Sequence, residues 1–301
     1  MFTKISEKNI HSIALPKESN LVNYSTFNEL ETDLLFRSFS IKYVVEGCER
    51  YGIEGAVFKV NSGEFLLANN LTGGKVLIES NKPVNGLCID ISPKIMNEAA
   101  MIFQYPDFFE EGGGFDESFF CSNLYPENKY RIENNSIGVK LKEIATVIAS
   151  NPNYNFEFTN EFYFELATCL IENQKCFPVQ IKRIEANKIR TKKHLFTKLH
   201  QGKLFVDNHF LTIKSVNEIA QASQMSEFQF FRLFKLLFEI SPFQYLNRKK
   251  LAYACSLIKQ QNYTLSEIAL LAGFSDLPTF SKCFKKNFGV IPYSLKKNEW
   301  R

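Results

Sequence analysis

Basic and aromatic side chains alternate along two stretches near the C-terminal end of the sequence. EFQFFRLFKLLF, from residue 227 to 238, carries Arg232 and Lys235, and LPTFSKCFKKNF, from residue 277 to 288, carries three lysines. Lysine and arginine neutralise phosphates, arginine can donate two hydrogen bonds to guanine, and apolar groups can contact the thymine methyl group. These residue types could therefore bind DNA, provided that one helix presents them together.

Each stretch has the apolar period of an amphipathic helix. The positions that we expect in the core recur at steps of three and four residues: Phe230, Leu233, Phe234 and Leu237, and then Phe280, Cys283, Phe284 and Phe288. For Phe228 and Phe231, packing between helices is an alternative to contact with DNA. The predicted DNA-binding residues are Ser226, Phe228, Gln229, Phe231, Arg232 and Lys235 in the first helix, and Leu277, Pro278, Thr279, Lys282, Lys285 and Lys286 in the second.

The sequence around these helices predicts one motif written twice. In each copy a short helix precedes a turn, and an N-cap residue, Ser226 or Asp276, opens the longer helix. Gly273 supplies a flexible position in the second turn. The two copies align position by position at a distance of about 50 residues. This pattern predicts two helix-turn-helix motifs, at 215–238 and 264–288.

Residues 241–261, between the two motifs, predict one amphipathic helix with a proline in its first turn. A helix of roughly 19 residues is about 28 Å long. Successive turns of the major groove on one face of DNA lie about 34 Å apart. One chain could therefore hold two recognition helices in successive grooves, where Arg232 and Lys282 would reach base edges.

Charge divides the chain into two parts. Residues 1–190 carry 19 Lys and Arg against 25 Asp and Glu, a net charge of −6, whereas residues 191–301 carry 17 against 7, a net charge of +10. A basic part joined to an acidic part indicates that only one of them meets a polyanion. We predict a sensor and dimerisation domain at 1–180, a linker at 181–193 and a DNA-binding domain at 194–301.

The N-terminal part predicts short strands between residues 36 and 91 and helices near 137–148 and 160–173. The expected class is α+β, with a small cupin-like β-barrel, flanking helices and an all-α C-terminal domain. Residues 36–91 contain no histidine and the seven cysteines include no CxxC pair, so we expect neither metal nor cofactor. No apolar run is long enough to span a membrane and the N-terminus lacks a secretory pattern, which predicts a cytoplasmic protein.

The C-terminal region, about residues 191–298, resembles the DNA-binding domain of AraC/XylS family transcription regulators. Matching positions in the first motif and spacer are Ile219, Ala220, Ser226, Arg232, Phe234, Lys235, Ser241, Pro242, Tyr245, Leu246 and Leu251. Those in the second motif are Ile268, Ala269, Gly273, Phe274, Asp276, Phe280, Ser281, Phe284, Lys285, Gly289 and Pro292. The departures are Glu239 in place of Gly, Pro278 in place of a small polar residue, Lys282 in place of Arg, and Leu295 and Lys296 in place of Tyr-Arg.

The N-terminal part is similar to the cupin-like sensor domains that often precede this DNA-binding domain. The resemblance implies a regulator that binds double-stranded DNA, responds to a small organic effector, forms a homodimer and contacts RNA polymerase. Two alternatives remain: an architectural DNA-binding protein without an effector, and a cupin-like enzyme that uses Glu46, Glu49, Glu54 and Glu64. The sequence shows no catalytic triad or phosphate loop, so we expect no enzymatic activity.

Overall fold

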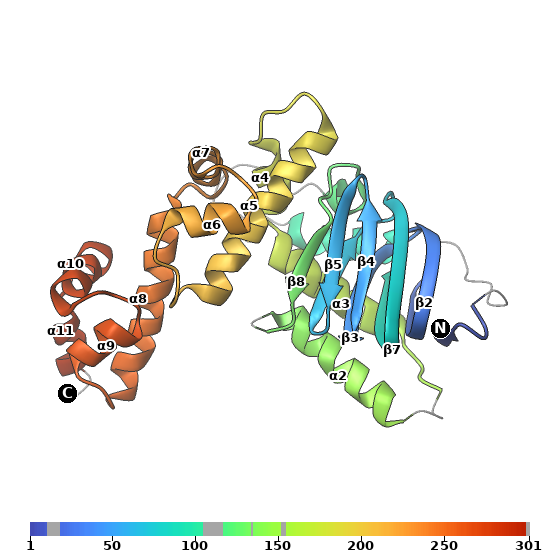
Figure 1. The fold of residues 1–301 in the computed structure, drawn as a ribbon, viewed down its shortest axis with the longest axis horizontal. Helices are drawn as coiled ribbons and strands as arrows, with labels where there is room; N and C mark the ends of the chain where they lie inside the picture. Colours follow the sequence, from blue (N-terminus) through green and yellow to red (C-terminus); the bar gives the residue numbers. More distant parts are fainter. Residues whose placement is uncertain (11–18, 105–116, 134, 152–154, 299–301) are drawn as a thin grey trace. The chain divides into compact units, whose positions relative to one another are not determined.

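Figure 1 shows the computed structural model of the chain, which describes residues 1–10, 19–104, 117–133, 135–151 and 155–298. The chain divides into two compact units, residues 1–197 and residues 198–301. A sheet with helices forms the first unit and helices alone form the second, so the predicted α+β class is confirmed. Helix α5 (Ile189–His209) begins in the first unit and ends in the second.

The described strands of the first unit form one eight-stranded sheet. Its main path runs β1-β2-β7-β3-β6-β8, while β4 pairs with β5 and with β7. β1 and β2 are parallel, and the other printed pairs are antiparallel. The bounds are β1 (Phe2–Ser6), β2 (Leu21–Leu35), β3 (Phe39–Glu46), β4 (Cys48–Ile53), β5 (Ala56–Asn61), β6 (Glu64–Ala68), β7 (Gly73–Ile91) and β8 (Asn128–Arg131).

Five of these strands, β3 to β7, fall within the region in which the sequence predicts strands. The longest of the five, β7, exceeds the short strands that the sequence predicts: its first half pairs with β4 and its second half pairs with β3. β1 and β8 end the main path of pairing, so closure of the sheet into a barrel is not seen among the described residues.

Helices flank the sheet of the first unit (Figure 1). They are α1 (Pro93–Met101), α2 (Ser136–Ser150), α3 (Asn160–Gln174) and α4 (Phe177–Lys182), with short 3-10 turns η1 (Ile102–Gln104) and η3 (Glu117–Cys121). The helices predicted near 137–148 and 160–173 are confirmed as α2 and α3, and their N-caps are Asn135 and Thr159. α3 packs against both α1 and α2.

Ion pairs of Lys193 hold the first turns of α5 within the first unit. Lys193 is buried, and its Nζ lies 2.9 Å from a carboxylate oxygen of Glu127 and 3.3 Å from one of Glu54. Glu127 also accepts a hydrogen bond of 2.6 Å from the Thr72 hydroxyl. A buried lysine requires such partners, because its charge is costly to desolvate. The predicted linker, residues 181–193, includes the end of α4 and the start of α5.

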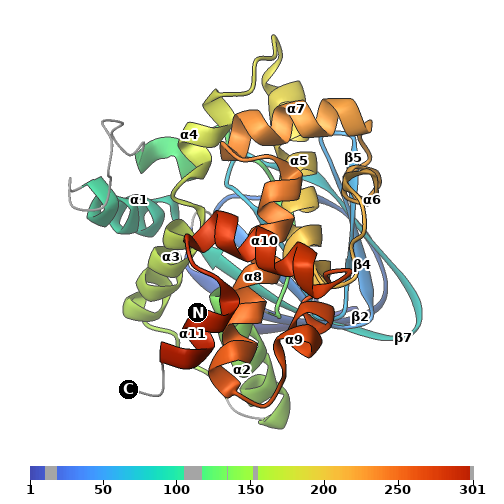
Figure 2. The same ribbon diagram turned by 90° about the vertical axis from the view of Figure 1, so that its left-hand side faces the viewer.

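The second unit continues from α5 through six further described helices. They are α6 (Val216–Ala222), α7 (Glu227–Phe238), α8 (Pro242–Gln260), α9 (Leu265–Leu271), α10 (Leu277–Phe288) and α11 (Pro292–Asn298). Figure 2 shows α9, α10 and α11 gathered around α8. None of the helices in the described part of the chain has the length and apolar character needed to cross a bilayer.

Candidate nucleic-acid interface

Helix α7 is held in place by its apolar stripe and its N-cap. Ser226 has extended backbone angles, and its hydroxyl accepts a hydrogen bond of 3.3 Å from the backbone N–H of Gln229. Such a bond satisfies one of the N–H groups that the first turn of a helix leaves unpaired. The predicted core residues of α7 are all buried: Phe230, Leu233, Phe234 and Leu237.

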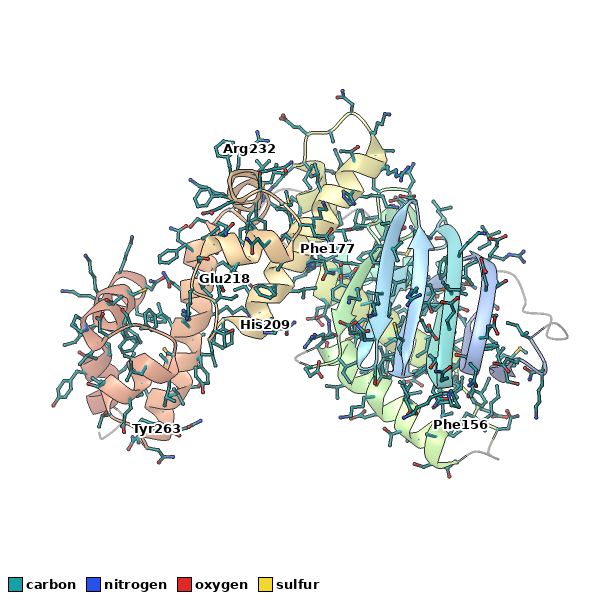
Figure 3. All side chains as sticks on the ribbon, viewed as in Figure 1. Phe156, Phe177, His209, Glu218, Arg232 and Tyr263 are labelled. Atoms are coloured by element: carbon teal, nitrogen blue, oxygen red, sulfur yellow. The ribbon has the colours of Figure 1, made fainter. Side chains whose placement is uncertain are left out.

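The opposite face of α7 carries its predicted DNA-binding residues at the surface of the second unit. Phe228 is 80% exposed and Phe231 is 43% exposed, while Arg232 and Lys235 are also exposed. Figure 3 shows Arg232 projecting outward from α7. For Phe228 the sequence leaves open packing between helices or contact with DNA, and packing inside this unit is not observed. Apolar and basic groups lie together on one accessible helix face, together with the exposed Ser226 and Gln229.

Helix α10 has a corresponding arrangement. Asp276 accepts a hydrogen bond of 2.6 Å from the backbone N–H of Thr279, and this interaction lowers the pKa of the Asp276 carboxyl. The hydrogen bond favours the ionised form, which also suits the positive end of the helix dipole. The exposed residues of the predicted set are Pro278, Thr279, Lys282, Lys285 and Lys286.

Two predictions for α10 are corrected by the structure. Phe288, expected in the core, is 46% exposed, because it is the last residue of the helix and packs on one side only, with its ring 4.6 Å from that of Phe284. Leu277, expected on the free face, is half-buried and packs against the core of the second motif. Phe280 and Phe284 are fully buried, and Cys283 is half-buried.

The two motifs match in their helices but not in their turns. α6 and α9 each contain 7 residues, and α7 and α10 each contain 12. The N-caps of the short helices, Ser215 and Thr264, are 49 residues apart, whereas those of the long helices, Ser226 and Asp276, are 50 apart. The expected position-by-position alignment is therefore wrong by one residue, which the second turn has gained.

Both turns need a left-handed backbone position. The second motif places Gly273 there, at a φ of 76°, as the sequence predicts, but the first places Gln224 there, at 52°. The helix ends repeat this difference, because α10 is followed by Gly289 at 76° and α7 by Glu239 at 62°. Glu239, which stands where the resembled family has Gly, thus has a backbone conformation that favours glycine.

A buried lysine on α8 joins the two motifs, and the sequence gave no prediction of its role. Lys250 is 8% exposed, and its ammonium group donates hydrogen bonds to the carbonyl oxygens of Gly273, at 2.9 Å, and Ile213, at 3.3 Å. Gly273 lies in the turn of the second motif and Ile213 precedes α6. Burial lowers the pKa of Lys250, and nearby Glu218 opposes that change.

A second polar cluster fixes α5 against α8 within the second unit. The carboxylate of Asp207 lies 2.6 Å from Lys249 Nζ and 2.8 Å from Lys203 Nζ, and it accepts a 2.6 Å hydrogen bond from the Tyr245 hydroxyl. Although burial alone would raise the pKa of Asp207, these partners hold it below its usual value. Lys203 and Lys249 thus share Asp207 as an ion-pair partner at the junction of α5 and α8.

Comparison with known proteins matches residues 219–298 to a helix-turn-helix domain family. The matched residues lie wholly within the C-terminal unit. Over 88 residues the chain is 35% identical to the probable transcriptional regulator LumQ of Photobacterium leiognathi, covering 29% of this chain and 36% of LumQ. Over 84 residues it is 35% identical to the transcriptional regulator GbdR of Pseudomonas aeruginosa, covering 28% of this chain and 23% of GbdR.

These matches thus span about a third and a quarter of the two relatives' own lengths. Among solved structures, the chain is similar to ToxT from Vibrio cholerae, with a TM-score of 0.36 and 14% identity over 92% of this chain and 98% of that one. The helix-turn-helix match includes α7 to α11 and all but the first three residues of α6.

The four carboxylates considered for catalysis do not form one site. Glu64 accepts hydrogen bonds from Asn61 and lies 2.9 Å from Lys129 Nζ. Glu54 pairs with Lys193, and Glu46 accepts a 3.2 Å hydrogen bond from Asn85. Glu49 alone of the four lines the cavity of the first unit.

Proposed function

We propose that the chain is a sequence-specific DNA-binding transcription regulator. The observation that carries this proposal is the pair of equally long helices, α7 and α10, each capped, each buried along one stripe and each exposing basic residues on the other. One continuous helix of 19 residues, α8, joins the two helix-turn-helix motifs, and the region from 191 to 301 has a net charge of +10. The length of α8, about 28 Å, is compatible with the distance between successive major grooves on one face of DNA.

In this proposal the two helices have different tasks. α7 presents Arg232 and Gln229, which can hydrogen-bond to base edges, beside Phe228 and Phe231, which can contact thymine methyl groups. α10 begins with Leu277 and Pro278, whose side chains cannot donate hydrogen bonds. Its exposed lysines, Lys282, Lys285 and Lys286, would mainly anchor phosphates and set the position of the protein on the duplex.

The first unit would supply regulation. Its sheet would be the open form of a cupin-like barrel that binds a small organic effector, and its cavity supports this assignment. We further propose that the regulator works in the cytoplasm as a homodimer, contacts RNA polymerase and has no enzymatic activity. An architectural protein without an effector is the second candidate.

The test selects duplexes that the full-length chain retains from a random DNA pool and then titrates cognate and scrambled duplexes by fluorescence anisotropy. We expect enrichment of one sequence and an affinity that falls steeply between about 50 and about 200 mM salt, because bound phosphates release counterions. The control is Lys82→Ala, which removes an exposed lysine of the first unit and should change neither result. Salt-independent binding would contradict DNA recognition, and binding without enrichment would favour the architectural role.

A further inference from the structure

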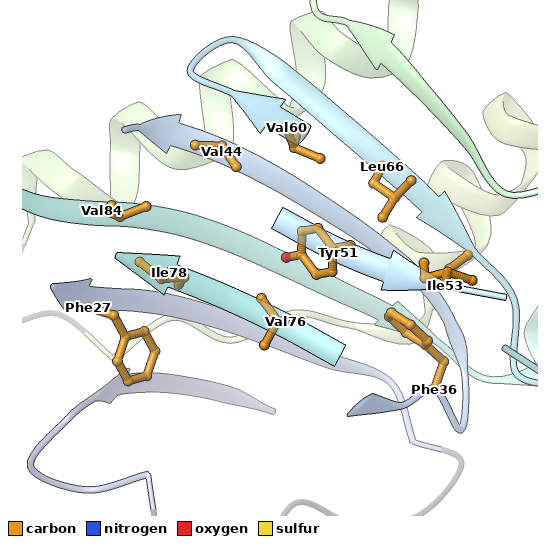
Figure 4. Close-up of a cluster of buried hydrophobic side chains, with 11 residues drawn as sticks. Phe27, Phe36, Val44, Tyr51, Ile53, Val60, Leu66, Val76, Ile78 and Val84 are labelled. Atoms are coloured by element: carbon orange, nitrogen blue, oxygen red, sulfur yellow. The ribbon is translucent and has the colours of Figure 1, made fainter. Parts of the chain in front are cut away.

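A cavity of about 480 Å³ lies against the sheet of the first unit, between β2, β3, β4 and β7. One part of its wall is apolar, formed by Phe27, Phe36, Val76 and Ile78, and Figure 4 shows these side chains in one buried cluster with Tyr51. A further part of the wall is polar, although strands in a packed core would place apolar residues there. The polar lining residues used below are Asn23, Ser25, Ser40, Lys42, Glu49, Tyr51, Cys88 and Asp90.

Strand register brings these polar residues together. Asn23 on β2 pairs with Cys88 on β7, which in turn pairs with Lys42 on β3. One step along the same face, Ser25 pairs with Gly86. A Cβ at Gly86 would lie 2.8 Å from Glu49 Oε1 and 2.7 Å from Ser25 Oγ. The missing side chain at position 86 therefore leaves room for the Glu49 carboxylate beside the row that contains Asn23.

The single lysine of this group already has an anionic partner. Lys42 Nζ lies 3.9 Å from an Asp90 carboxylate oxygen and also contacts the Cys88 sulfur. Burial acts against the charge of Lys42, but Asp90 and Cys88, with a smaller effect of Glu49, together outweigh it and the pKa of Lys42 is raised. Asp90 also accepts a hydrogen bond from Ser40. The charges of Lys42 and Asp90 thus cancel inside the cavity.

Glu49 and Asn23 lack comparable partners. Glu49 is 5% exposed and accepts a hydrogen bond from Tyr51, and no basic group of the described residues forms an ion pair with it. Asn23 is 4% exposed, and its Oδ1 has no hydrogen-bond donor among the residues that the structure describes. Buried polar groups are almost always satisfied, so the Asn23 oxygen calls for a donor. The Tyr51 hydrogen bond leaves the Glu49 charge unneutralised, so the carboxylate calls for a cation.

We propose that this cavity binds an organic cation, an ammonium group carried on an apolar body, whose N–H groups bond to Glu49 and Asn23. The inference rests on the proposed regulator and names the chemical class of its effector. A protonated amine supplies both the missing donors and the missing positive charge. The rings of Phe27, Phe36 and Tyr51 provide aromatic faces, which attract cations, and the neighbouring aliphatic wall accepts the apolar body.

An anion or a neutral molecule fits this wall less well. A carboxylate would approach two acidic groups, Glu49 and Asp90, while the nearest lysine, Lys42, is already paired with Asp90. The cavity is also lined by Arg37 and Asp33, which have opposite charges and are both exposed to solvent. A neutral alcohol could donate one hydrogen bond to Asn23 but would leave the Glu49 charge uncompensated in a buried site. The arrangement of charges therefore selects the sign of the ligand.

Proton linkage gives the proposal a second readout. Burial raises the pKa of Glu49, against the opposing effects of the Tyr51 hydrogen bond and of Lys42. The other ionisable groups that line the cavity are Asp33, Arg37, Lys42, Tyr43, Tyr51, Cys88 and Asp90. Among these, burial raises the pKa of Cys88 to about 12. A bound cation favours the ionised form of Glu49. Binding should therefore strengthen as pH rises and Glu49 loses its proton.

The experiment compares three probes of similar shape on the full-length chain by isothermal titration calorimetry without DNA: phenylethylamine, phenylethanol and phenylacetate. We expect phenylethylamine to bind most tightly and its affinity to rise from about pH 5 to about pH 8. Glu49→Gln, which preserves shape and the Tyr51 contact, should weaken phenylethylamine about tenfold or more and remove the pH dependence. Glu31→Gln, an exposed carboxylate outside the cavity wall, is the matched control and should behave like the unchanged chain.

Asn23→Leu, which removes the unpaired oxygen without leaving a void, provides a second variant if Glu49→Gln does not fold. It should also weaken phenylethylamine binding. Tighter binding of phenylacetate, an unchanged affinity in both variants, or no binding of phenylethylamine at millimolar concentration would each overturn the proposal. Because DNA binding is measured separately, any of these results would leave the proposed DNA-binding function standing, whereas loss of sequence selection would not affect the calorimetry.

Discussion

Gly273→Ala should destabilise the second helix-turn-helix motif far more than Gly289→Ala, although both glycines have a φ of 76°. The left-handed conformation alone costs a residue with a Cβ about 1 kcal/mol. Nothing lies within 4 Å of a Cβ at Gly289, so that figure is the whole expected cost there. At Gly273 the new Cβ would lie 2.8 Å from the backbone oxygen of Leu211 and 3.3 Å from Lys250 Cε and Nζ.

The backbone oxygen of Leu211 cannot rotate away, so the turn or Lys250 must move. Displacement of Lys250 weakens its 2.9 Å hydrogen bond to the Gly273 carbonyl, and a hydrogen bond to a charged group contributes about 1.5 to 3 kcal/mol. Together with the backbone cost, the expected loss for Gly273→Ala is about 2.5 to 4 kcal/mol. The corresponding loss for Gly289→Ala stays near 1 kcal/mol.

Native-state hydrogen exchange of the amides in α9 and α10 measures these losses on the full-length chain. This method reports the free energy of opening of one segment, which matters because the two units need not unfold together. Equal losses for the two variants would refute the reasoning, since backbone conformation would then explain both and the contacts with Leu211 and Lys250 would contribute nothing. Lys250→Met should mimic the larger loss without altering the backbone at Gly273.

Further variants test other parts of the structure. Arg232→Ala should cost about 1 to 3 kcal/mol on the selected duplex and little on scrambled DNA, whereas Lys286→Ala should weaken both and reduce the salt slope by about one, as measured by anisotropy. If Lys282→Ala relaxes sequence choice as much as Arg232→Ala does, α10 reads bases and the phosphate-anchoring role is wrong. Gln224→Gly should raise the stability of the first motif by about 1 kcal/mol in urea unfolding, because it relieves a φ of 52°, and an unchanged or lower stability would count against strain there. Glu49→Gln should flatten the pH dependence of the free energy of unfolding. Because the pKa of Glu49 is raised in the folded state, its contribution to stability is full below its pKa in the unfolded state and is lost as pH rises through its pKa in the folded state. The variant should therefore gain stability near neutral pH.

The C-terminal unit could be predicted well because local signals agree with its fold. Its helices are amphipathic, Ser226 and Asp276 act as N-caps, and the turn at Gly273 has the backbone conformation that glycine favours. Each signal acts over a few residues and can be recognised without knowing the tertiary contacts. Lys250 could not be assigned in this way, because its two carbonyl partners come from turns 37 and 23 residues away.

Strand β2 was missed for a different reason. Its inward positions include Asn23 and Ser25, so the alternation of apolar and polar residues that marks a half-buried strand is broken. Those residues line a cavity instead of filling a core. The failure of the pattern therefore coincides with the proposed ligand site, where packing and binding place different demands on the same strand.

The additional residue in the second turn bears on how the duplicated motif can change over time. One residue added inside α10 would rotate everything beyond it by about 100°, which would turn Phe284 away from the core and the lysines toward it. Added between α9 and α10, it leaves both helices at 7 and 12 residues and their buried faces intact. Insertions can thus be tolerated at this junction while the helices keep their lengths. The two copies can then differ in the orientation of α7 and α10, and in the proposed DNA-binding role they could come to favour different half-sites.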